Sequence, residues 1–293
     1  MDCAFVGAGA VANEYLDGLG GSDLRLVAIC DTDRERAAGL AAAAPGDPAV
    51  YTDLDNLLAA EPAPLVINLT SHAAHAPVTE TALAADRHVF SEKPLALAPE
   101  RAAALVETAR DRGVALGCAP LTPRCDAQRH ARGLLADGRL GRVRLATATA
   151  NVGRVDEWHD RPGSFLDVGP LYDGAVYPLS LLVAWFGPVD RVRSADAVAA
   201  WPDEVAPRTP HVEATVEFAD GPVVALRASF YADHRSREFY GLELHGDDGT
   251  LYLRDTGALA AERDAVTVRG GDRESTVAPH PAPRRERRDV EGP

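Results

Sequence analysis

The sequence predicts an α/β protein, with a doubly wound parallel sheet in its N-terminal half and then an α+β domain with a largely antiparallel open sheet. Up to about residue 120, short apolar runs alternate with helical patterns, which is typical of a parallel sheet covered on both faces. Strand-like stretches joined by Asp-Gly turns follow. A length of 293 residues suits two domains. We expect them at residues 1–120 and 121–280, with a Pro- and Arg-rich tail at 281–293.

The first predicted strand leads into a glycine-rich turn. The stretch "CAFVGAGAVANEYLDGL" passes from an apolar run through Gly7 and Gly9 into a helical pattern. Such a turn at a helix N-terminus brings backbone amides close to a pyrophosphate, and the helix dipole favours negative charge there. Ala12 takes the third small position, where helix and strand must pack closely. Small residues also crowd turns for steric reasons alone, so a tight turn without a ligand is the alternative.

An acidic residue follows the second predicted strand. The stretch "LRLVAICDTD" brings in Asp31, which lies 24 residues after Gly7, close to the spacing of about 20 expected for a carboxylate that binds dinucleotide ribose hydroxyls. A carboxylate repels a 2'-phosphate, so NAD is favoured over NADP, although Arg34 and Arg36 are near enough in sequence to bind that phosphate. Asp31 could also cap the following helix.

Three more strands and two helices complete the predicted parallel sheet. The strands are "PLVINLT", "RHVFSEKP" and "VALGCAP", and the helices are "APVTETALAAD" and "PERAAALVETARDRG". Ligands of such sheets bind beyond the carboxyl ends of the strands, so we expect Thr70, His75, Glu92 and Lys93 to border one crevice with the glycine-rich turn. His72 and His75 lack further ligand-type residues in their pattern, so we expect helix-cap or surface positions for them and no metal.

Lys93 is the only lysine in the chain, although Lys and Arg together number 30. A bias toward arginine is expected to spare a lysine where a guanidinium cannot replace a primary amine. Arginine stays protonated and spreads its donors in a planar fork, whereas the lysine ammonium is compact and changes its pKa readily on burial. Lys93 is thus a candidate for chemistry. The alternative is that one lysine survived by chance on a solvated loop.

The stretch "GPLYDGAVYPL" predicts a helix with Pro170 in its first turn. Asp173 and Tyr177, four residues apart, would then project from one face. Gly174 and Ala175 would keep the surface between them small enough for a flat ring to approach. The alternative is an amphipathic core helix in which Tyr177 is half-buried and Asp173 is solvated.

Alternating apolar residues predict the strands of the second domain. In "HVEATVEFADGPVVALRASF", every second residue of the first strand is apolar, and an Asp-Gly pair marks a hairpin turn. The stretch "GLELHGDDGTLYL" repeats this pattern around a second Asp-Gly pair. A helix, "DAQRHARGLLADG", precedes these strands.

The chain is acidic, with 44 Asp and Glu residues against 30 Lys and Arg residues and a net charge of -14. This charge repels nucleic acid and anionic membranes, so we expect neither as a partner. The four cysteines show neither zinc-finger spacing nor the density of a secreted disulfide scaffold. No basic leader precedes the first apolar run. These features indicate a cytoplasmic protein.

Four motifs, "GAGAVA", "NLTSHAAH", "SEKPLA" and "GPLYDGAVYPL", occur in an order and at intervals that resemble the glucose-fructose oxidoreductase, inositol dehydrogenase and rhizopine-catabolism (Gfo/Idh/MocA) family. The resemblance implies an N-terminal Rossmann domain that binds NAD or NADP, and hydride transfer to or from a sugar, polyol or related alcohol. It implies that Lys93 contacts substrate and cofactor, that Glu92 shapes its loop, and that Asp173 matches the aspartate of the catalytic helix. Tyr177 stands where many relatives carry histidine, as in some sugar- and dihydrodiol-oxidising branches.

By the same resemblance, dinucleotide-binding residues follow several strands of the first domain: Gly7, Gly9, Ala10, Val11, Ala12, Asp31, Thr70, His75, Glu92 and Lys93. Trp158 and His159 are candidates for lining a sugar pocket, and a structural role is the alternative for both. The open sheet of relatives often pairs with another copy, so we expect a homo-oligomer through the C-terminal sheet.

These residues permit a coherent reaction. Oxidation of a secondary alcohol needs a base for the hydroxyl proton while hydride leaves for nicotinamide, and reduction needs the same group as an acid. Tyrosine, with an ordinary pKa of about 10, becomes a competent base where a neighbouring ammonium stabilises its phenolate. The hypothesis is an NAD(P)-dependent dehydrogenase or reductase of CH–OH groups in a sugar, polyol or cyclic diol. Tyr177 is its acid and base, Lys93 its electrostatic partner and substrate anchor, and Asp173 orients a substrate hydroxyl. The alternatives are a non-catalytic nucleotide-binding sensor or regulatory subunit, and an NAD-assisted glycosidase.

Overall fold

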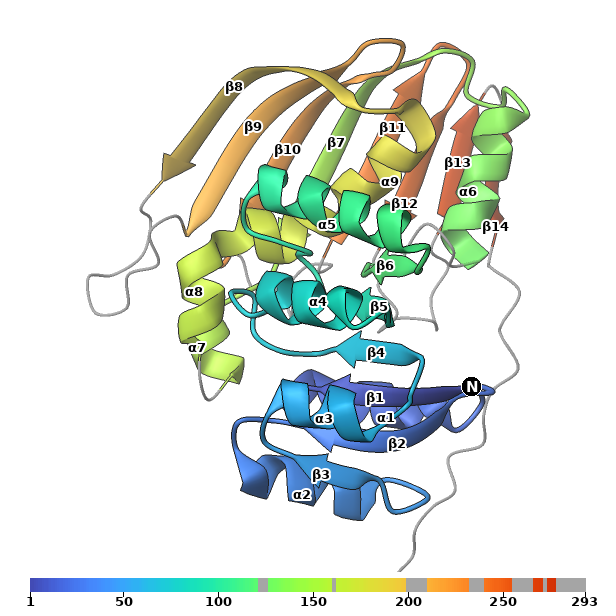
Figure 1. Cartoon of the computed structure of the whole chain (residues 1–293). Coiled ribbons are helices and arrows are strands. Elements are labelled where there is room, and N and C mark those ends of the chain that lie inside the picture. The colour runs from blue at the N-terminus through green and yellow to red at the C-terminus, as the bar shows by residue number, and fades with distance from the viewer. Residues whose placement is uncertain are drawn as a thin grey trace, which may run out of the picture. The chain divides into compact units, whose positions relative to one another are not determined.

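The computed structural model describes residues 1–120, 126–159, 162–198, 210–231, 240–254, 266–270 and 273–277. The chain forms two compact units (Figure 1). The first comprises Met1–Pro120 and His159–Val176, and the second comprises Leu121–Trp158 and Tyr177–Pro293. The expected tail at 281–293 lies outside the described residues.

A parallel six-stranded sheet with the order β3-β2-β1-β4-β5-β6 forms the centre of the first unit. Its strands are β1 (Asp2–Val6), β2 (Arg25–Cys30), β3 (Ala49–Tyr51), β4 (Leu65–Asn68), β5 (His88–Ser91) and β6 (Leu116–Cys118). Its helices are α1 (Ala10–Leu19), α2 (Arg34–Ala43), α3 (Leu54–Ala60), α4 (His75–Ala84), α5 (Pro99–Arg112) and α8 (Gly163–Pro170), with a π-helical turn η2 (Leu171–Ala175). Strand order reverses at β1, between β2 and β4, which is where ligands of such sheets bind. The predicted doubly wound sheet is confirmed, and the short β3 and α3 are additional.

Helices cover both faces of this sheet. On one face, side chains of α3, α4 and α5 pack against the strands in a buried cluster that includes Leu57, Leu83, Leu105, Val66 and Val89. On the other face, α1 and α2 pack in a cluster that includes Leu16, Leu40, Phe5, Ile29 and Ile67. Ala12 is fully buried in the second cluster, so α1 packs closely on the sheet as its small residue predicts.

The second unit contains a mixed eight-stranded sheet with the order β14-β13-β12-β11-β7-β10-β9-β8. Its strands are β7 (Val143–Asn151), β8 (Val189–Val198), β9 (His211–Phe218), β10 (Val223–Ser229), β11 (Tyr240–Gly246), β12 (Thr250–Arg254), β13 (Val266–Gly270) and β14 (Arg273–Val277). Its helices are α6 (Asp126–Ala136), α7 (Val155–Trp158) and α9 (Val176–Phe186). Among the described neighbouring strands of this sheet, β7 and β10 are the one parallel pair, so the largely antiparallel prediction is confirmed.

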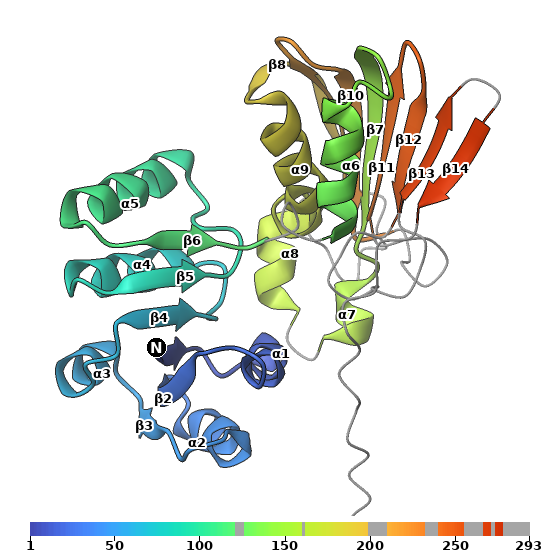
Figure 2. The same ribbon diagram turned by 90° about the vertical axis from the view of Figure 1, so that its right-hand side faces the viewer.

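The two faces of this sheet differ in polarity. Helices α6 and α9 lie on one face (Figure 2), and the strands place there the buried side chains of Ala148, Val216, Leu226, Leu244 and Leu251. Alternate residues on the same strands point to the other face, and they include Thr147, Thr149, Glu213, Thr215 and Arg227. The strands β9 and β10, and β11 and β12, form the two predicted hairpins.

Helical backbone resumes at Pro170, as predicted, directly after a break at Gly169. Gly169 takes a φ of 76°, a left-handed conformation that favours glycine, and Pro170 after it has no N–H to continue the α-helical ladder. The π-helical turn η2 follows, and α9 begins at Val176. Asp173 therefore lies in the π turn and Tyr177 in an α-helix. That the two side chains project from one face stays a prediction. Single π turns are frequent at functional sites.

The described ranges contain neither a helix suited to cross a membrane nor a cluster of metal-ligating side chains. Every helix there falls short of the length and apolar character that a bilayer-spanning segment needs. No group of three or more His, Cys, Asp or Glu side chains suited to a metal ion occurs among the described residues.

Candidate active site

The glycine-rich turn lies against the end of β4. Gly7 has a φ of 101° and donates its N–H to the carbonyl oxygen of Cys30 at 2.8 Å. A Cβ at Gly7 would lie 2.5 Å from the backbone carbon and oxygen of Leu69, which is too close for packed atoms. At Gly9, the N-cap of α1, no described atom lies within 4 Å of such a Cβ. The fold thus requires glycine at position 7, and the space beside Gly9 suits a closely approaching pyrophosphate.

Asp31 directly follows β2 and binds two backbone amides. Its Oδ2 accepts a hydrogen bond from the N–H of Ala8 at 2.7 Å, and its Oδ1 accepts one from the N–H of Asp33 at 2.9 Å. The carboxylate therefore holds the glycine-rich turn. The cap of α2 is Asp33, whose side chain accepts from the N–H groups of Glu35 and Arg36. The interpretation of Asp31 as the helix cap is wrong.

The substitution Asp31→Asn is expected to loosen this turn. Asparagine keeps one acceptor oxygen but turns an amide nitrogen toward the second N–H, so the free energy of unfolding should fall by about 1–3 kcal/mol. Urea denaturation followed by circular dichroism measures this change. Asp17→Asn, at an exposed position of α1, is the matched control and should change stability by less than about 0.5 kcal/mol. Equal midpoints for the two variants would contradict the prediction.

A buried polar network holds the loop between β4 and α4. Asn68 is fully buried, and its Nδ2 donates to the carbonyl oxygen of His75 at 2.9 Å and to Oγ1 of Thr79 at 3.1 Å. Its Oδ1 accepts from the hydroxyl of Thr70 at 2.7 Å. Asn68 was not among the predicted site residues, although a polar residue ending an apolar strand run was an available signal.

His75 joins this loop to the loop that carries Lys93. The residue is 1% exposed, with Nδ1 2.8 Å from the carbonyl oxygen of Pro94 and Nε2 3.0 Å from that of Thr70. Carbonyl oxygens only accept, so a neutral ring with one N–H bonds one of them at a time, and a protonated ring bonds both. Burial lowers the pKa of His75, and the contacts to the two carbonyl oxygens oppose this change. The expected cap or surface position is wrong for this ring.

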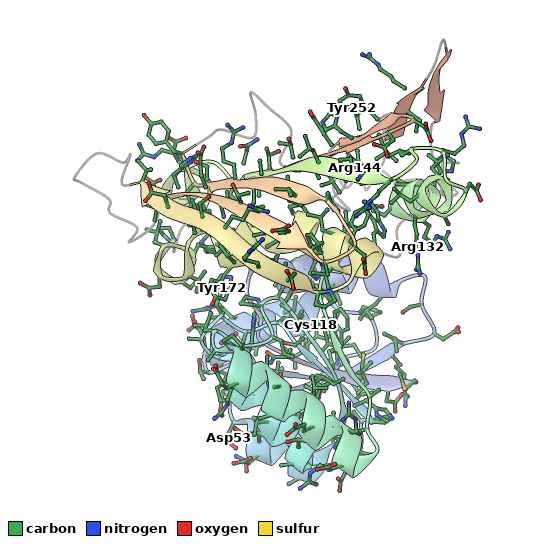
Figure 3. The ribbon with its side chains drawn as sticks, turned by 90° about the horizontal axis from the view of Figure 1, so that it is seen from above. Asp53, Cys118, Arg132, Arg144, Tyr172 and Tyr252 are labelled. Atoms are coloured by element: carbon green, nitrogen blue, oxygen red, sulfur yellow. The ribbon has the colours of Figure 1, made fainter. Side chains whose placement is uncertain are left out.

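Glu92 links the Lys93 loop to the helix of the glycine-rich turn. Its Oε1 accepts from the hydroxyl of Tyr15 on α1 at 2.7 Å, and its Oε2 accepts from the N–H of Lys93 at 3.0 Å. Cys118, labelled in Figure 3, is the last residue of β6. Burial, with the Glu92 carboxylate adding to it, raises the pKa of the Cys118 thiol to about 12. This cysteine therefore stays protonated near neutral pH and does not act as a thiolate nucleophile.

Lys93 and Asp173 form the central ion pair of the site. The Nζ of Lys93 lies 2.6 Å from Oδ1 of Asp173 and donates a second hydrogen bond to the carbonyl oxygen of Asp173 at 2.9 Å. The two side chains are only 11% and 5% exposed. Loss of one partner would leave an uncompensated buried charge, which is far more costly than breaking a surface pair. Two alternatives are therefore wrong: that Lys93 lies on a solvated loop, and that Asp173 is solvated.

His72 is the third member of this cluster. It is 7% exposed, with Nδ1 3.1 Å from the carbonyl oxygen of Ser164 and Nε2 3.9 Å from Oδ1 of Asp173. Its ring packs edge-on against Phe165, with 5.1 Å between centroids. Burial lowers the pKa of His72, while the Asp173 carboxylate opposes this change and Lys93 reinforces it. The expected cap or surface position is wrong here too.

Tyr177 is the second residue of α9 and is half-buried. It belongs to the second unit, whereas Lys93 and Asp173 belong to the first. The hydroxyl of Ser180, one turn further along α9, donates to the carbonyl oxygen of Tyr177 at 2.8 Å.

The remaining predicted residues lie in the first turn of α1, at the end of α7 and directly after α7. Ala10 is exposed and Val11 is half-buried. The half-buried ring of His159 packs against Phe165 with 4.8 Å between centroids. The side chain of Trp158 lies outside the described part of the structure.

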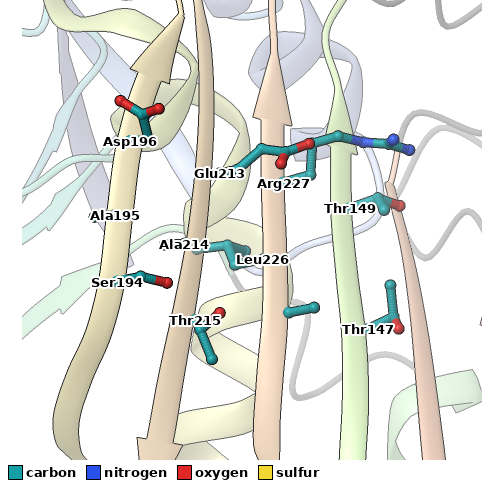
Figure 4. Close-up of a pocket in the computed structure, with 11 residues that line it drawn as sticks. Thr147, Thr149, Ser194, Ala195, Asp196, Glu213, Ala214, Thr215, Leu226 and Arg227 are labelled. Atoms are coloured by element: carbon teal, nitrogen blue, oxygen red, sulfur yellow. The ribbon is translucent and has the colours of Figure 1, made fainter.

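A groove of about 420 Å³ lies on the polar face of the eight-stranded sheet (Figure 4). Its lining comes from β7, β8, β9 and β10: Thr147, Thr149, Ser194, Ala195, Asp196, Glu213, Ala214, Thr215, Ala225, Leu226 and Arg227. None of these is a residue that the sequence predicted for catalysis or cofactor binding. All of these lining residues belong to the second unit.

Two family models match the chain. The GFO/IDH/MocA model described as an oxidoreductase family with an NAD-binding Rossmann fold matches residues 1–119. The model of the GFO/IDH/MocA C-terminal domain matches residues 128–252.

Individual proteins are similar over different lengths. The 1,5-anhydro-D-fructose reductase of Ensifer adhaerens is 27% identical, over 94% of this chain and 82% of the relative. The D-glucoside 3-dehydrogenase of Escherichia coli K12 is 29% identical, over 83% of this chain and 74% of the relative. The dTDP-3,4-didehydro-2,6-dideoxy-alpha-D-glucose 3-reductase of Streptomyces violaceoruber is 38% identical, but the match covers 42% of this chain and only 36% of that protein.

Solved structures share the fold. The WlbA dehydrogenase from Bordetella pertussis, in complex with NADH and UDP-GlcNAcA, superposes with a TM-score of 0.80 at 22% identity, over 96% of this chain and 83% of that one. The UDP-N-acetylglucosamine 3-dehydrogenase GnnA from Acidithiobacillus ferrooxidans gives a TM-score of 0.76 at 23% identity, over 94% and 82% of the two chains.

Proposed function

Because the chain belongs to the Gfo/Idh/MocA family of oxidoreductases and carries its NAD-binding Rossmann domain, we propose that it transfers hydride between a nicotinamide dinucleotide and a CH–OH group of a sugar, polyol or cyclic diol. The observation that carries this proposal is the buried pair of Lys93 and Asp173, with 2.6 Å between Nζ and Oδ1. Burying two charges is costly, and apolar residues of similar volume often serve stability as well, so such a pair at the ligand-binding edge of the sheet favours chemistry. The names of the curated relatives, which are reductases and dehydrogenases of sugars, support a sugar-like substrate.

The first unit suits NAD better than NADP. The open space at Gly9 and the start of α1 fit a pyrophosphate. The carboxylate of Asp31 would repel a 2'-phosphate, and Arg36 already pairs with Asp33 at 2.9 Å. When bound, the nicotinamide ring accepts the hydride in oxidation and supplies it in reduction.

In this proposal, three residues bind the substrate and transfer its proton. Lys93 binds the reacting oxygen of the substrate and keeps a positive charge beside it. Asp173 holds that ammonium through its carboxylate and carbonyl oxygens and orients a neighbouring substrate hydroxyl. In oxidation, Tyr177 takes the hydroxyl proton as hydride leaves the carbon, and in reduction it returns the proton. An ammonium near the phenol would favour the phenolate that this step needs.

The test is NADH absorbance with the purified protein and a panel of sugars, polyols and cyclic diols. The expected result is NADH formation with at least one class and its loss in Tyr177→Phe, by about 100-fold or more. Ligand binding without hydride transfer by any member of the panel would instead indicate a sensor. Cleavage of a glycoside without net NADH would indicate NAD-assisted hydrolysis.

We also propose that the polar face of the eight-stranded sheet pairs with a second copy. The groove there carries both charge signs, in Asp196, Glu213 and Arg227, so a two-fold axis can set acidic groups of one copy against Arg227 of the other. Leu145, on the same face, is 56% exposed. Light scattering after gel filtration should give a multiple of the 31.0 kDa chain mass. Thr147→Arg should lower this mass, whereas Ala104→Arg, at an exposed position of α5, should not. A monomeric wild type would overturn this proposal.

A further inference from the structure

We propose that His72 is a positioning residue for Lys93, acting through the carboxylate of Asp173, and that a proton on its Nε2 weakens the hold of Asp173 on Lys93. The part that concerns turnover rests on the proposed function. The part that concerns the ion pair rests on the geometry of the first unit alone.

The contact with Ser164 fixes the tautomer of the neutral ring. The Nδ1 of His72 lies 3.1 Å from the carbonyl oxygen of Ser164, which only accepts, so Nδ1 carries the hydrogen. The neutral ring then keeps its lone pair on Nε2. This atom lies 3.9 Å from Oδ1 of Asp173, and the Nζ of Lys93 contacts the same oxygen at 2.6 Å.

The two protonation states of His72 therefore act differently on one oxygen atom. A neutral Nε2 offers only a lone pair, which a carboxylate does not attract, so Oδ1 of Asp173 is left to Lys93. A protonated ring brings a second cation to Oδ1, draws the carboxylate toward itself and repels the ammonium of Lys93. The outcome is a weaker or displaced Lys93–Asp173 pair.

Four elements surround the His72 ring. The π turn η2 contributes Asp173, the loop after β5 contributes Lys93, and α4 contributes His75, whose ring centroid is 5.9 Å away. Helix α8 contributes the uncharged Ser164 carbonyl and the Phe165 ring.

Burial, reinforced by the charges of Lys93 and His75 and opposed by Asp173, lowers the pKa of His72 below its ordinary 6.5. His72 is thus neutral near pH 7, and its proton enters only as the pH falls through that lowered value. We therefore expect the Lys93–Asp173 pair to weaken at acid pH.

The single lysine of the sequence permits a direct test. Protein labelled with 13Cε- and 15Nζ-lysine gives one side-chain NMR signal, that of Lys93. In wild type, this signal should shift as the pH is lowered from about 7.5 to about 5, with a midpoint below the ordinary histidine value. In His72→Asn, whose amide nitrogen can still donate to Ser164, the shift should be absent. His211→Asn, on β9 of the second unit, is the matched control and should keep it.

A second measurement, made on wild type, tests the proposal even if His72→Asn does not fold. The 15N spectrum of labelled histidine in wild type should show neutral His72 with its hydrogen on Nδ1. A hydrogen on Nε2 in the neutral ring, or a Lys93 shift that persists in His72→Asn, would overturn the proposal.

Turnover gives a readout that separates this proposal from the proposed function. The wild-type rate should fall at acid pH, and His72→Asn should retain at least about threefold more of its neutral-pH rate at about pH 5.5. An unchanged acid limb in His72→Asn would contradict the positioning role. If no substrate turns over, the proposed function fails, and the Lys93 signal still decides the role of His72.

Discussion

The substitution Lys93→Arg is expected to lower kcat by about 100-fold or more while leaving the fold intact. The side chain of Lys93 is only 11% exposed, and its ammonium makes two short contacts with Asp173. A guanidinium keeps the charge but is planar and wider, so it cannot place one compact donor between those oxygens and a substrate oxygen. Steady-state NADH formation, with NADH affinity measured separately by fluorescence, provides the test.

The matched control reverses this exchange on the surface. Arg110 is exposed near the end of α5, and Arg110→Lys should leave kcat within about twofold of wild type. Near-normal turnover in Lys93→Arg would show that any cation serves at this position. The assignment of Lys93 as substrate anchor would then be lost.

The substitution Gly7→Ala is expected to cause the largest loss of stability, about 3 kcal/mol or more. The residue has a φ of 101°, and an added Cβ would lie only 2.5 Å from the backbone of Leu69 and 2.8 Å from the N of Thr70. Both neighbours are backbone atoms at the end of β4, so they cannot move without disturbing the sheet. Urea denaturation should show a lower midpoint, and NADH affinity should fall with it.

Two other glycines separate the steric effect from cofactor contact. Gly18 lies at an exposed helical position of α1 with no described atom within 4 Å of an added Cβ, so Gly18→Ala should stabilise by about 0.5–1 kcal/mol. Gly9→Ala should keep stability within about 0.5 kcal/mol but weaken NADH binding, because its methyl group enters the space left for the pyrophosphate. Equal stability of the Gly7 and Gly9 variants would contradict the steric explanation.

The parallel sheet could be predicted because its signals are local. Apolar runs, the Gly7–Gly9 turn and helix-forming stretches each depend on a few neighbouring residues, and their alternation indicates a parallel sheet. The choice of Lys93 depended on composition, on its position after a predicted strand and on the resemblance to the family. Its burial and its pairing with Asp173 agree with that choice, while its part in catalysis stays a proposal.

The burial of His72 and His75 could not be predicted from their own segment. A loop rich in alanine and histidine between a strand and a helix is usually open to solvent. Here His72 is covered by Ser164 and Phe165, about ninety residues later in the chain, and His75 is fixed by the carbonyl oxygen of Pro94. Such contacts depend on tertiary structure, and no periodicity in the sequence records them.

The π turn escaped prediction for a different reason. Pro170 is a good signal for a helix start, but its effect depended on the left-handed conformation of Gly169 before it. Glycine adopts that conformation about as readily as a right-handed one, so the sequence leaves the choice open.

The first unit is assembled from two separate stretches of chain, Met1–Pro120 and His159–Val176. The partner of Lys93 is therefore encoded in a short insert between two parts of the other unit. A gene recombination that replaced everything after Pro120 would keep Lys93 from one parent and take the segment 159–176, which carries the partner of this lysine, from the other. A chimaera that exchanges only the second unit would need to retain residues 159–176 from the N-terminal parent. Such an exchange requires three crossovers rather than one.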